Sequence, residues 1–134
     1  MRVALVTLFL CACGPEVVVT PCGLWLSPDT DVARVLDIER ASVDWRLVTC
    51  GALDRWQVTV ADSETWATTR DGHVGGQMNC DSRGILVGPS FASLAHEFAH
   101  VAECPTHNYE HSGWKSLDAQ GLSTFGRIEK VMSR

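Results

Sequence analysis

The sequence lacks several features that would assign it to common classes. No apolar run approaches the roughly 20 residues that a membrane-spanning helix needs. The 16 acidic residues outnumber the 11 basic ones, for a formal charge of −5, and no basic stripe indicates a nucleic-acid partner. The chain has six cysteines, five prolines and one tyrosine, and it shows neither internal repeats nor low-complexity segments. Its irregularly spaced glycines do not form a phosphate loop. At 134 residues, a single domain is expected.

The first thirteen residues have the order of an export signal. Arg2 precedes the segment 3–10, which is apolar except for Thr7, and Leu10-Cys11-Ala12-Cys13 follows. This end resembles the lipobox of bacterial lipoproteins, with Leu10 and Ala12 in the positions that define cleavage before a lipidated cysteine. The resemblance implies a signal peptide at 1–12, lipidation of Cys13, and a tether with an initial strand at 13–28. An ordinary secretory signal and an uncleaved N-terminal strand are the alternatives.

The resemblance also implies a location. An exported lipoprotein is held at the bacterial cell envelope through its lipid anchor only, because the chain has no polybasic patch to add membrane affinity. Gly14 stands where an aspartate is associated with retention in the inner membrane. If the cell is Gram-negative, the outer membrane is therefore favoured.

Four cysteines remain after the signal and the lipidated residue, and an even number in a small exported domain predicts two disulfides. Three connectivities are possible, and we favour the sequential pairs Cys22–Cys50 and Cys80–Cys104. No two of the four are spaced closely enough for the C-x₂₋₄-C knuckle of a four-cysteine zinc site. The four residues are Cys22, Cys50, Cys80 and Cys104.

The sequence H-E-x-x-H at 96–100 is the strongest functional signal. On a helix, residues four apart share a face, so His96 and His100 can bind one metal ion. Glu97 lies about a quarter-turn away, where it can hold a metal-bound water and act as a general base. This arrangement predicts Zn²⁺ as cofactor and hydrolysis as the reaction.

The remaining pattern predicts an α+β domain. A helix begins after Ser27 or Asp29 and runs to about Val43, and strands follow at 45–49, 56–60, 65–69 and 84–88. Glycines at 72, 75 and 76 indicate turns or a mobile loop. Ser90 is the expected cap of a helix at 91–103, which Cys104-Pro105 ends, and a last amphipathic helix covers 122–131.

This order of elements around H-E-x-x-H resembles a minimal zincin, with a small mixed or antiparallel sheet, an N-terminal helix, the active-site helix and a C-terminal helix. The resemblance is specific at 84–114 and architectural elsewhere, and it assigns 29–134 to a catalytic domain. It implies that the strand before the active-site helix is the sheet edge on which a peptide substrate lies. Its central residues here are Ile85, Leu86 and Val87.

The third zinc ligand is not decided by the spacing. His107 is one residue late for the metzincin pattern, the methionine turn of that subfamily is missing, and the short tail does not suit the thermolysin-like arrangement. The segment 110–114 looks like the [D/E]-H-x-x-W that follows H-E-x-x-H in some small bacterial zincin-like proteins, which favours His111. His107 and a carboxylate such as Glu103 are the alternatives.

The same resemblance suggests supporting roles for neighbours of His111. Glu110 could brace a ligand, Trp114 could pack beneath the loop, and Tyr109 or His107 could stabilise an oxyanion. The chain is therefore predicted to be a zinc-dependent metallopeptidase acting on a peptide or protein substrate. The alternatives are a zincin-like protein that binds zinc or a partner with little or no catalysis, and a disulfide-stabilised surface lipoprotein with a structural role.

Overall fold

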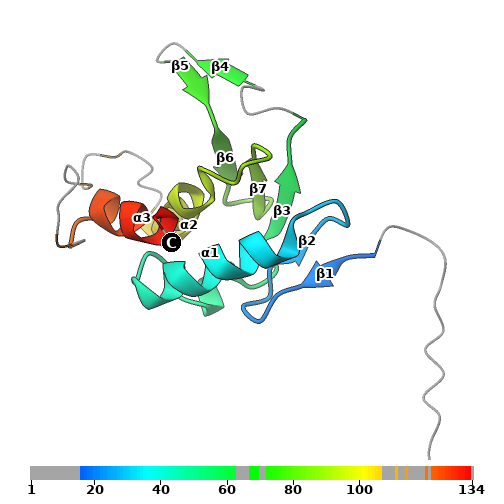
Figure 1. Ribbon diagram of the computed structural model, residues 1–134, viewed down its shortest axis with the longest axis horizontal. Helices are drawn as coiled ribbons and strands as arrows, with labels where there is room; N and C mark the ends of the chain where they lie inside the picture. Colours follow the sequence, from blue (N-terminus) through cyan, green and yellow to red (C-terminus); the bar gives the residue numbers. More distant parts are fainter. Residues whose placement is uncertain are drawn as a thin grey trace, which may run out of the picture.

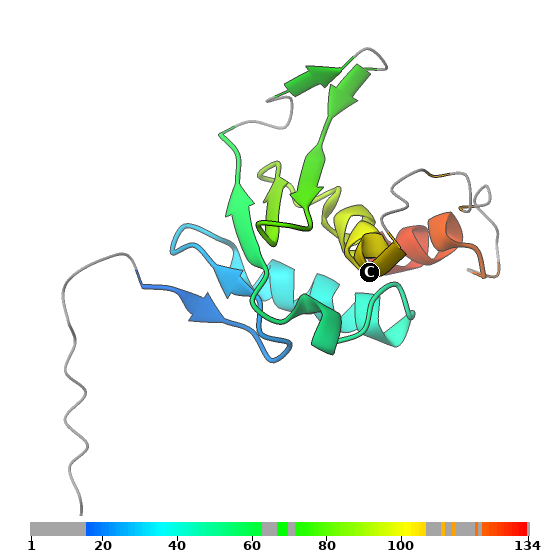
Figure 2. The same cartoon turned by 180° about the vertical axis from the view of Figure 1, so that it is seen from behind.

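The computed structural model describes residues 16–62, 67–69, 72–106, 111, 114, 120 and 122–133. This part of the chain contains three α-helices, a five-stranded mixed sheet and a separate two-stranded sheet. The predicted α+β class is confirmed (Figures 1 and 2). None of the described helices is long and apolar enough to cross a membrane.

The five-stranded sheet has the order β1-β2-β3-β7-β6. The inner strands β2 (Trp25–Leu26), β3 (Gln57–Val60) and β7 (Gly84–Val87) are parallel to one another. The two outer strands, β1 (Val18–Val19) and β6 (Gly76–Asn79), each pair antiparallel with their neighbour. A hairpin of β4 (Ala67–Thr69) and β5 (Gly72–Val74) extends beyond β6, at the top of Figure 1.

The predicted edge strand is not an edge. Ile85, Leu86 and Val87 lie in β7, which pairs with β3 on one side and with β6 on the other. The described edge on this side is β6, which comes from a glycine-bearing segment that the sequence predicted to be a turn or loop. Glycine weakens the strand signal because it adds no side chain to the pleated surface. Tertiary packing outweighs that weakness in β6.

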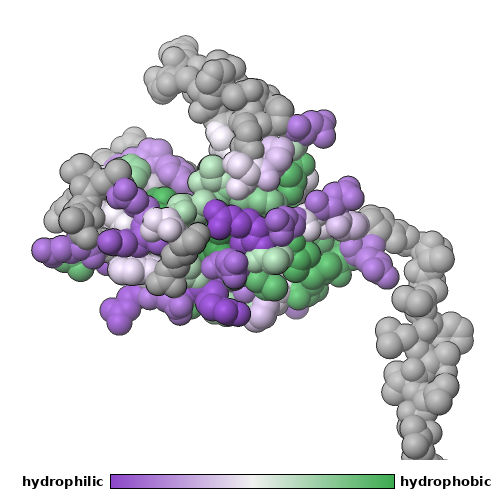
Figure 3. All heavy atoms as spheres, viewed as in Figure 1, coloured by the Kyte–Doolittle hydropathy of each residue, from purple (hydrophilic) through white to green (hydrophobic). Residues whose placement is uncertain are grey.

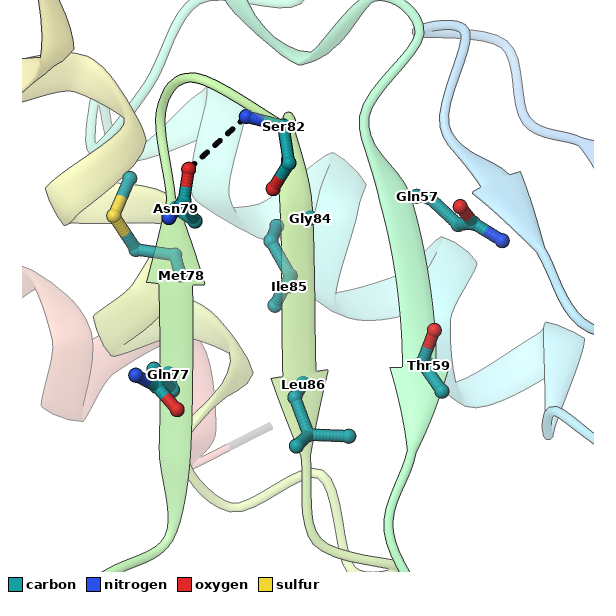
Figure 4. A pocket seen from close by; sticks show the side chains of 9 residues that line it. All are labelled: Gln57, Thr59, Gln77, Met78, Asn79, Ser82, Gly84, Ile85 and Leu86. Atoms are coloured by element: carbon teal, nitrogen blue, oxygen red, sulfur yellow. Dashed lines mark hydrogen bonds between the residues drawn. The ribbon is translucent and has the colours of Figure 1, made fainter.

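The helices cover one face of the sheet. Alternate strand residues such as Leu26, Val58 and Ile85 are buried on that face, where they join a core that includes Phe98 of α2 (Leu94–Glu103). The opposite face carries Gln57, Thr59 and Gln77 and is shown in Figure 4, with the helices behind the sheet. A shallow hollow of about 400 Å³ on this face is lined by nine residues: Gln57, Thr59, Gln77, Met78, Asn79, Ser82, Gly84, Ile85 and Leu86.

Local backbone chemistry shifts the predicted helix boundaries. Helix α1 (Val32–Asp44) is capped by Asp31, whose carboxylate accepts a hydrogen bond from the Arg34 amide at 3.1 Å, and neither Ser27 nor Asp29 is the cap. Helix α2 begins at Leu94, with Ser93 as its N-cap residue instead of Ser90. Phe91 has φ of 58°, a left-handed conformation that cannot belong to the helix.

The C-terminal helix follows its prediction more closely. Helix α3 (Thr124–Met132) starts two residues later than predicted, and the Ser123 hydroxyl caps it by accepting a hydrogen bond from the Gly126 amide at 2.9 Å. The strand predicted at 45–49 is wrong. The amides of Trp45 and Leu47 donate to the carbonyls of Ala41 and Ser42, so the chain closes the end of α1 in a turn.

Both favoured disulfides are confirmed. Cys22–Cys50 has an S–S distance of 2.00 Å and Cys80–Cys104 one of 2.08 Å. The second bond joins the residue after β6 to the residue after α2. It therefore links the outer strand to the end of the helix that carries H-E-x-x-H.

Candidate metal centre

Helix α2 presents His96 and His100 on one face. Leu94, Phe98 and Val101, on its other faces, are buried in the core, which fixes the rotation of the helix. His100 is 8 % exposed, and His96 is partly buried beside it. Their Nε2 atoms lie 3.2 Å apart, as the spacing of four residues predicts.

The third histidine comes from the segment after the helix. The Nε2 atom of His111 lies 3.0 Å from that of His100 and 3.1 Å from that of His96. His111 is exposed, so the cluster opens toward solvent on its side. The structure brings together the three histidines that the sequence favoured as ligands.

Three mutual nitrogen contacts cannot all be hydrogen bonds. Each Nε2 either carries a proton and donates or lacks one and accepts. Among three atoms in contact, two must be of the same kind, so at least one of the three pairs has no hydrogen bond. A cation shared by three lone pairs would satisfy all three nitrogens at once.

The spacing also fits a small transition-metal ion. Zn–N bonds of about 2.0–2.1 Å at tetrahedral angles place two nitrogen ligands about 3.3 Å apart. The three observed separations are 3.0–3.2 Å. Three imidazoles would leave one tetrahedral position for water or substrate, the pattern of a catalytic site more than of a closed structural one.

The electrostatics keep two of these histidines neutral. Burial, together with the neighbouring His100 and His111, lowers the pKa of His96 to about 4. Burial and the proximity of His111 also lower the pKa of His100 to about 4. At neutral pH both imidazoles are therefore uncharged, which is the form that coordinates a metal.

Glu97 lies on the side of α2 that faces β6. Its side chain is buried, and burial raises its pKa to about 7. A Cβ atom on Gly76 would lie 2.7 Å from the Glu97 Oε1 and 2.5 Å from the Ser93 Oγ. Only a glycine permits this approach of strand and helix, and the Ser93 hydroxyl strengthens it by donating to the Gly75 carbonyl at 2.6 Å.

An aromatic platform supports the cluster. The Trp114 ring centroid lies 4.7–5.0 Å from the ring centroids of the three histidines and 5.1 Å from that of Phe125 in α3. Trp114 is 8 % exposed, and its Nε1 donates a hydrogen bond to the Glu103 Oε1 at 2.5 Å. Trp114 therefore makes direct ring contacts with all three histidines, whereas most of the loop beneath which it was predicted to pack lies outside the described residues.

Several predicted site residues lie outside the described residues: His107, Tyr109, Glu110 and the lipidation candidate Cys13. From the sequence, Glu103 was predicted only as an alternative metal ligand. Its carboxylate is not part of the three-residue cluster and instead contacts Trp114 and the far side of His100. The spacing of three residues between His100 and Glu103 is the signal that could have predicted this contact.

The chain was also compared with known proteins. No protein-family model, curated protein or solved structure matches it. The residues and the geometry of the site are therefore the basis on which its function can be inferred.

Proposed function

We propose that this chain is a zinc-dependent metallopeptidase of zincin type. The observation that carries the proposal is the triangle of three Nε2 atoms within 3.0–3.2 Å of one another, two of them from H-E-x-x-H on a single helix. Zinc is the ion favoured by three neutral imidazoles in a tetrahedral arrangement with an open position. His96, His100 and His111 are its proposed ligands.

The proposed chemistry divides between the metal and one carboxylate. His96, His100 and His111 would hold the zinc ion, which would supply a Lewis acid for the peptide carbonyl and would lower the pKa of a water molecule at the open position. Glu97 then takes a proton from the attacking water and delivers it to the leaving amine. The pKa of Glu97, raised to about 7 by burial, suits a group that must both accept and donate near neutral pH.

The described sheet edge supplies a place for an extended peptide. Strand β6 pairs with β7 on one side only, and its first residue, Gly76, contacts Glu97. A peptide that adds to this edge would place its backbone beside the proposed base. We therefore assign substrate pairing to Gly76–Asn79 in place of Ile85, Leu86 and Val87.

The test combines metal analysis with peptide cleavage. The disulfide-bonded protein should hold one zinc per chain and cleave unstructured peptides. Glu97→Gln should keep the zinc and lose about 10²- to 10⁴-fold in cleavage rate, the usual contribution of a general base. Glu129→Gln, the same change at an exposed position of α3, should behave like the parent. Equal cleavage by Glu97→Gln and the parent would contradict the mechanism, and zinc binding without cleavage by the parent would favour the non-catalytic alternative.

We also propose that the protein is exported and anchored through Cys13. Two disulfides fit an oxidising compartment. Val17 is the fourth residue after Cys13, so even a fully extended chain can place Val17 no more than about 14 Å from the lipidated residue. The exposed apolar side chains Val17, Val18, Val19 and Trp25 lie around β1 and β2, where Figure 3 shows a hydrophobic surface.

This location has its own test. Mass spectrometry of the mature protein should find Cys13 as the N-terminal residue with attached acyl chains. Cys13→Ser should release the protein from the membrane fraction, while the disulfides remain intact. An unmodified N-terminus upstream of Cys13 would contradict the proposal.

A further inference from the structure

The second ring nitrogen of His100 is buried without a hydrogen bond. Its Nε2 faces the other two histidines, whereas its Nδ1 points away from them and has no hydrogen-bond partner within the described residues. A buried polar atom left unsatisfied destabilises the fold. A partner for this nitrogen is therefore expected among the groups around it.

The charged group beside this nitrogen is Glu103, one turn further along α2. Its Oε1 lies 3.8 Å from the His100 Nδ1, and both side chains are largely buried. A hydrogen bond between them needs a separation of about 2.9 Å, so an approach of about 0.9 Å would complete it. The two atoms are thus close neighbours, slightly too far apart for a hydrogen bond.

Glu103 is held on its other side by Trp114. The indole Nε1 donates to the same Oε1 at 2.5 Å, and the indole ring packs on the His100 ring with centroids 4.7 Å apart and planes inclined by 31°. Trp114 lies three residues after His111, and its amide donates to the His111 carbonyl at 2.8 Å. One carboxylate therefore connects the helix that carries His100 to the segment that carries His111.

We propose that Glu103 is the positioning residue of the metal centre. Its carboxylate accepts the Nδ1 proton of His100, which fixes the tautomer in which the Nε2 lone pair is free. The same carboxylate holds the imidazole ring against the ring of Trp114. A carboxylate in this position also makes the other nitrogen a stronger ligand. This is the role that the sequence predicted for Glu110. The zinc part of the inference rests on the proposed function, whereas the tautomer part does not.

The first test measures zinc affinity by competition with a chelator of known affinity. Loss of a carboxylate that braces a ligating histidine weakens metal binding by about 10- to 100-fold. Glu103→Gln should raise the zinc Kd toward the lower end of that range, because an amide oxygen can still accept the proton, and Glu103→Ala toward the upper end. Trp114→Phe, which keeps a ring and removes the N–H, should show a smaller effect, and Glu129→Gln should match the parent.

The second test uses the metal-free protein. Long-range ¹H–¹⁵N correlation spectra of the histidine rings should show His100 with its proton on Nδ1. Glu103→Ala should shift the population toward the other tautomer, while Glu129→Gln leaves it unchanged. A merely structural glutamate would alter stability without moving this signal. If Glu103→Ala does not fold by circular dichroism, the spectrum of Glu103→Leu decides, because leucine fills much of the same space and has no acceptor for the Nδ1 proton.

The two readouts separate the possible failures. A parent protein that binds no zinc would overturn the proposed function, and the tautomer would still decide the role of Glu103. An Nε2-protonated His100 in the parent, or a tautomer unaffected by loss of the carboxylate, would overturn the role of Glu103 even if zinc binds tightly.

Discussion

The Glu97 side chain rests against the backbone of Gly76. A Cβ atom built on Gly76 would stand 2.7 Å from the Glu97 Oε1 and 3.0 Å from its Cγ. The proposed general base is therefore positioned by a strand as well as by its own helix. The same strand, β6, is the described sheet edge to which we assign the substrate. One strand would therefore position both the general base and the bound peptide.

Gly76→Ala should impair cleavage while leaving zinc bound. The added methyl group must displace Glu97 or Ser93, and a misplacement of about 1 Å at a reacting group can cost on the order of 100-fold in rate. His96 and His100 keep their places on α2, so the zinc Kd should change little. Peptide cleavage and chelator competition on the same sample measure the two quantities.

The chain offers a matched control for this variant. Gly51→Ala adds the same methyl group at a position with no atom within 4 Å of the new Cβ. Its cleavage rate should match that of the parent. Equal losses in both variants, or full activity of Gly76→Ala, would contradict the positioning of Glu97 by β6.

His111 should be required for tight zinc binding, and His107 should not. His111→Ala removes one of the three converging Nε2 atoms, and the zinc Kd should rise by more than the roughly 100-fold that loss of a bracing residue can cause. His107→Ala removes the rival ligand predicted from the sequence. Isothermal titration with zinc decides between them, and a large effect confined to His107→Ala would reassign the third ligand.

In the metal-free protein, Glu97→Gln should become increasingly more stable than the parent as pH rises. Burial raises the pKa of Glu97 from 4.5 to about 7, so between these values the folded protein keeps a proton that the unfolded chain has released. The stability from Glu97 is complete below pH 4.5 and is lost as pH rises through 7. The free energy of unfolding of Glu97→Gln, relative to the parent, should therefore increase over this window by at most about 3 kcal/mol.

His96 and His100 give the free energy of unfolding the opposite dependence on pH. Their contribution cancels when Glu97→Gln is compared with the parent. Burial lowers the pKa values of His96 and His100, so below pH 6.5 the unfolded chain binds protons first, and stability falls toward pH 4. Both proteins contain these residues. Urea titrations in the presence of a chelator, from pH 4 to 8, measure the difference, and a difference independent of pH would contradict the buried state of Glu97.

Much of the helical part of the site could be predicted from the sequence. Three signals can be read without knowing the fold: the spacing of His96 and His100, the apolar faces of α2 and the even number of cysteines. The structure confirms that the two histidines lie side by side and that both disulfides form. The prediction of His111 as a ligand depended on a resemblance, because the sequence between Cys104 and His111 has no strong periodicity.

The sheet could not be predicted in the same way. Strand order depends on pairing between segments far apart in the chain, and the β7 sequence, Gly84–Val87, is apolar enough to suit either an edge or a central position. The glycine at position 76 suggests a turn, yet it begins a strand because α2 packs directly against it. Phe91 at φ of 58° likewise delays the start of α2 through a turn that helical periodicity does not reveal.

The two disulfides should contribute similarly to stability and differently to the metal site. Their sequence separations are 28 and 24 residues, so each should stabilise the fold by about 3 kcal/mol in the chain-entropy model. Only Cys80–Cys104 joins the end of β6 to the end of α2, close to Glu103. The double variant Cys80→Ala/Cys104→Ala should therefore lower both the unfolding free energy and the zinc affinity.

Cys22→Ala/Cys50→Ala is the matched control, because it removes a loop closure of nearly equal length that does not join β6 to α2. It should lower the unfolding free energy by a similar amount and leave the zinc Kd near the parent value, provided that both are measured below the unfolding transition. The entropy of loop closure acts on the unfolded chain, whereas ligand positioning acts on the folded one. Comparison of the two double variants therefore separates the effect on stability from the effect on zinc binding. Equal losses of zinc affinity in both variants would show that the metal site depends on global stability alone.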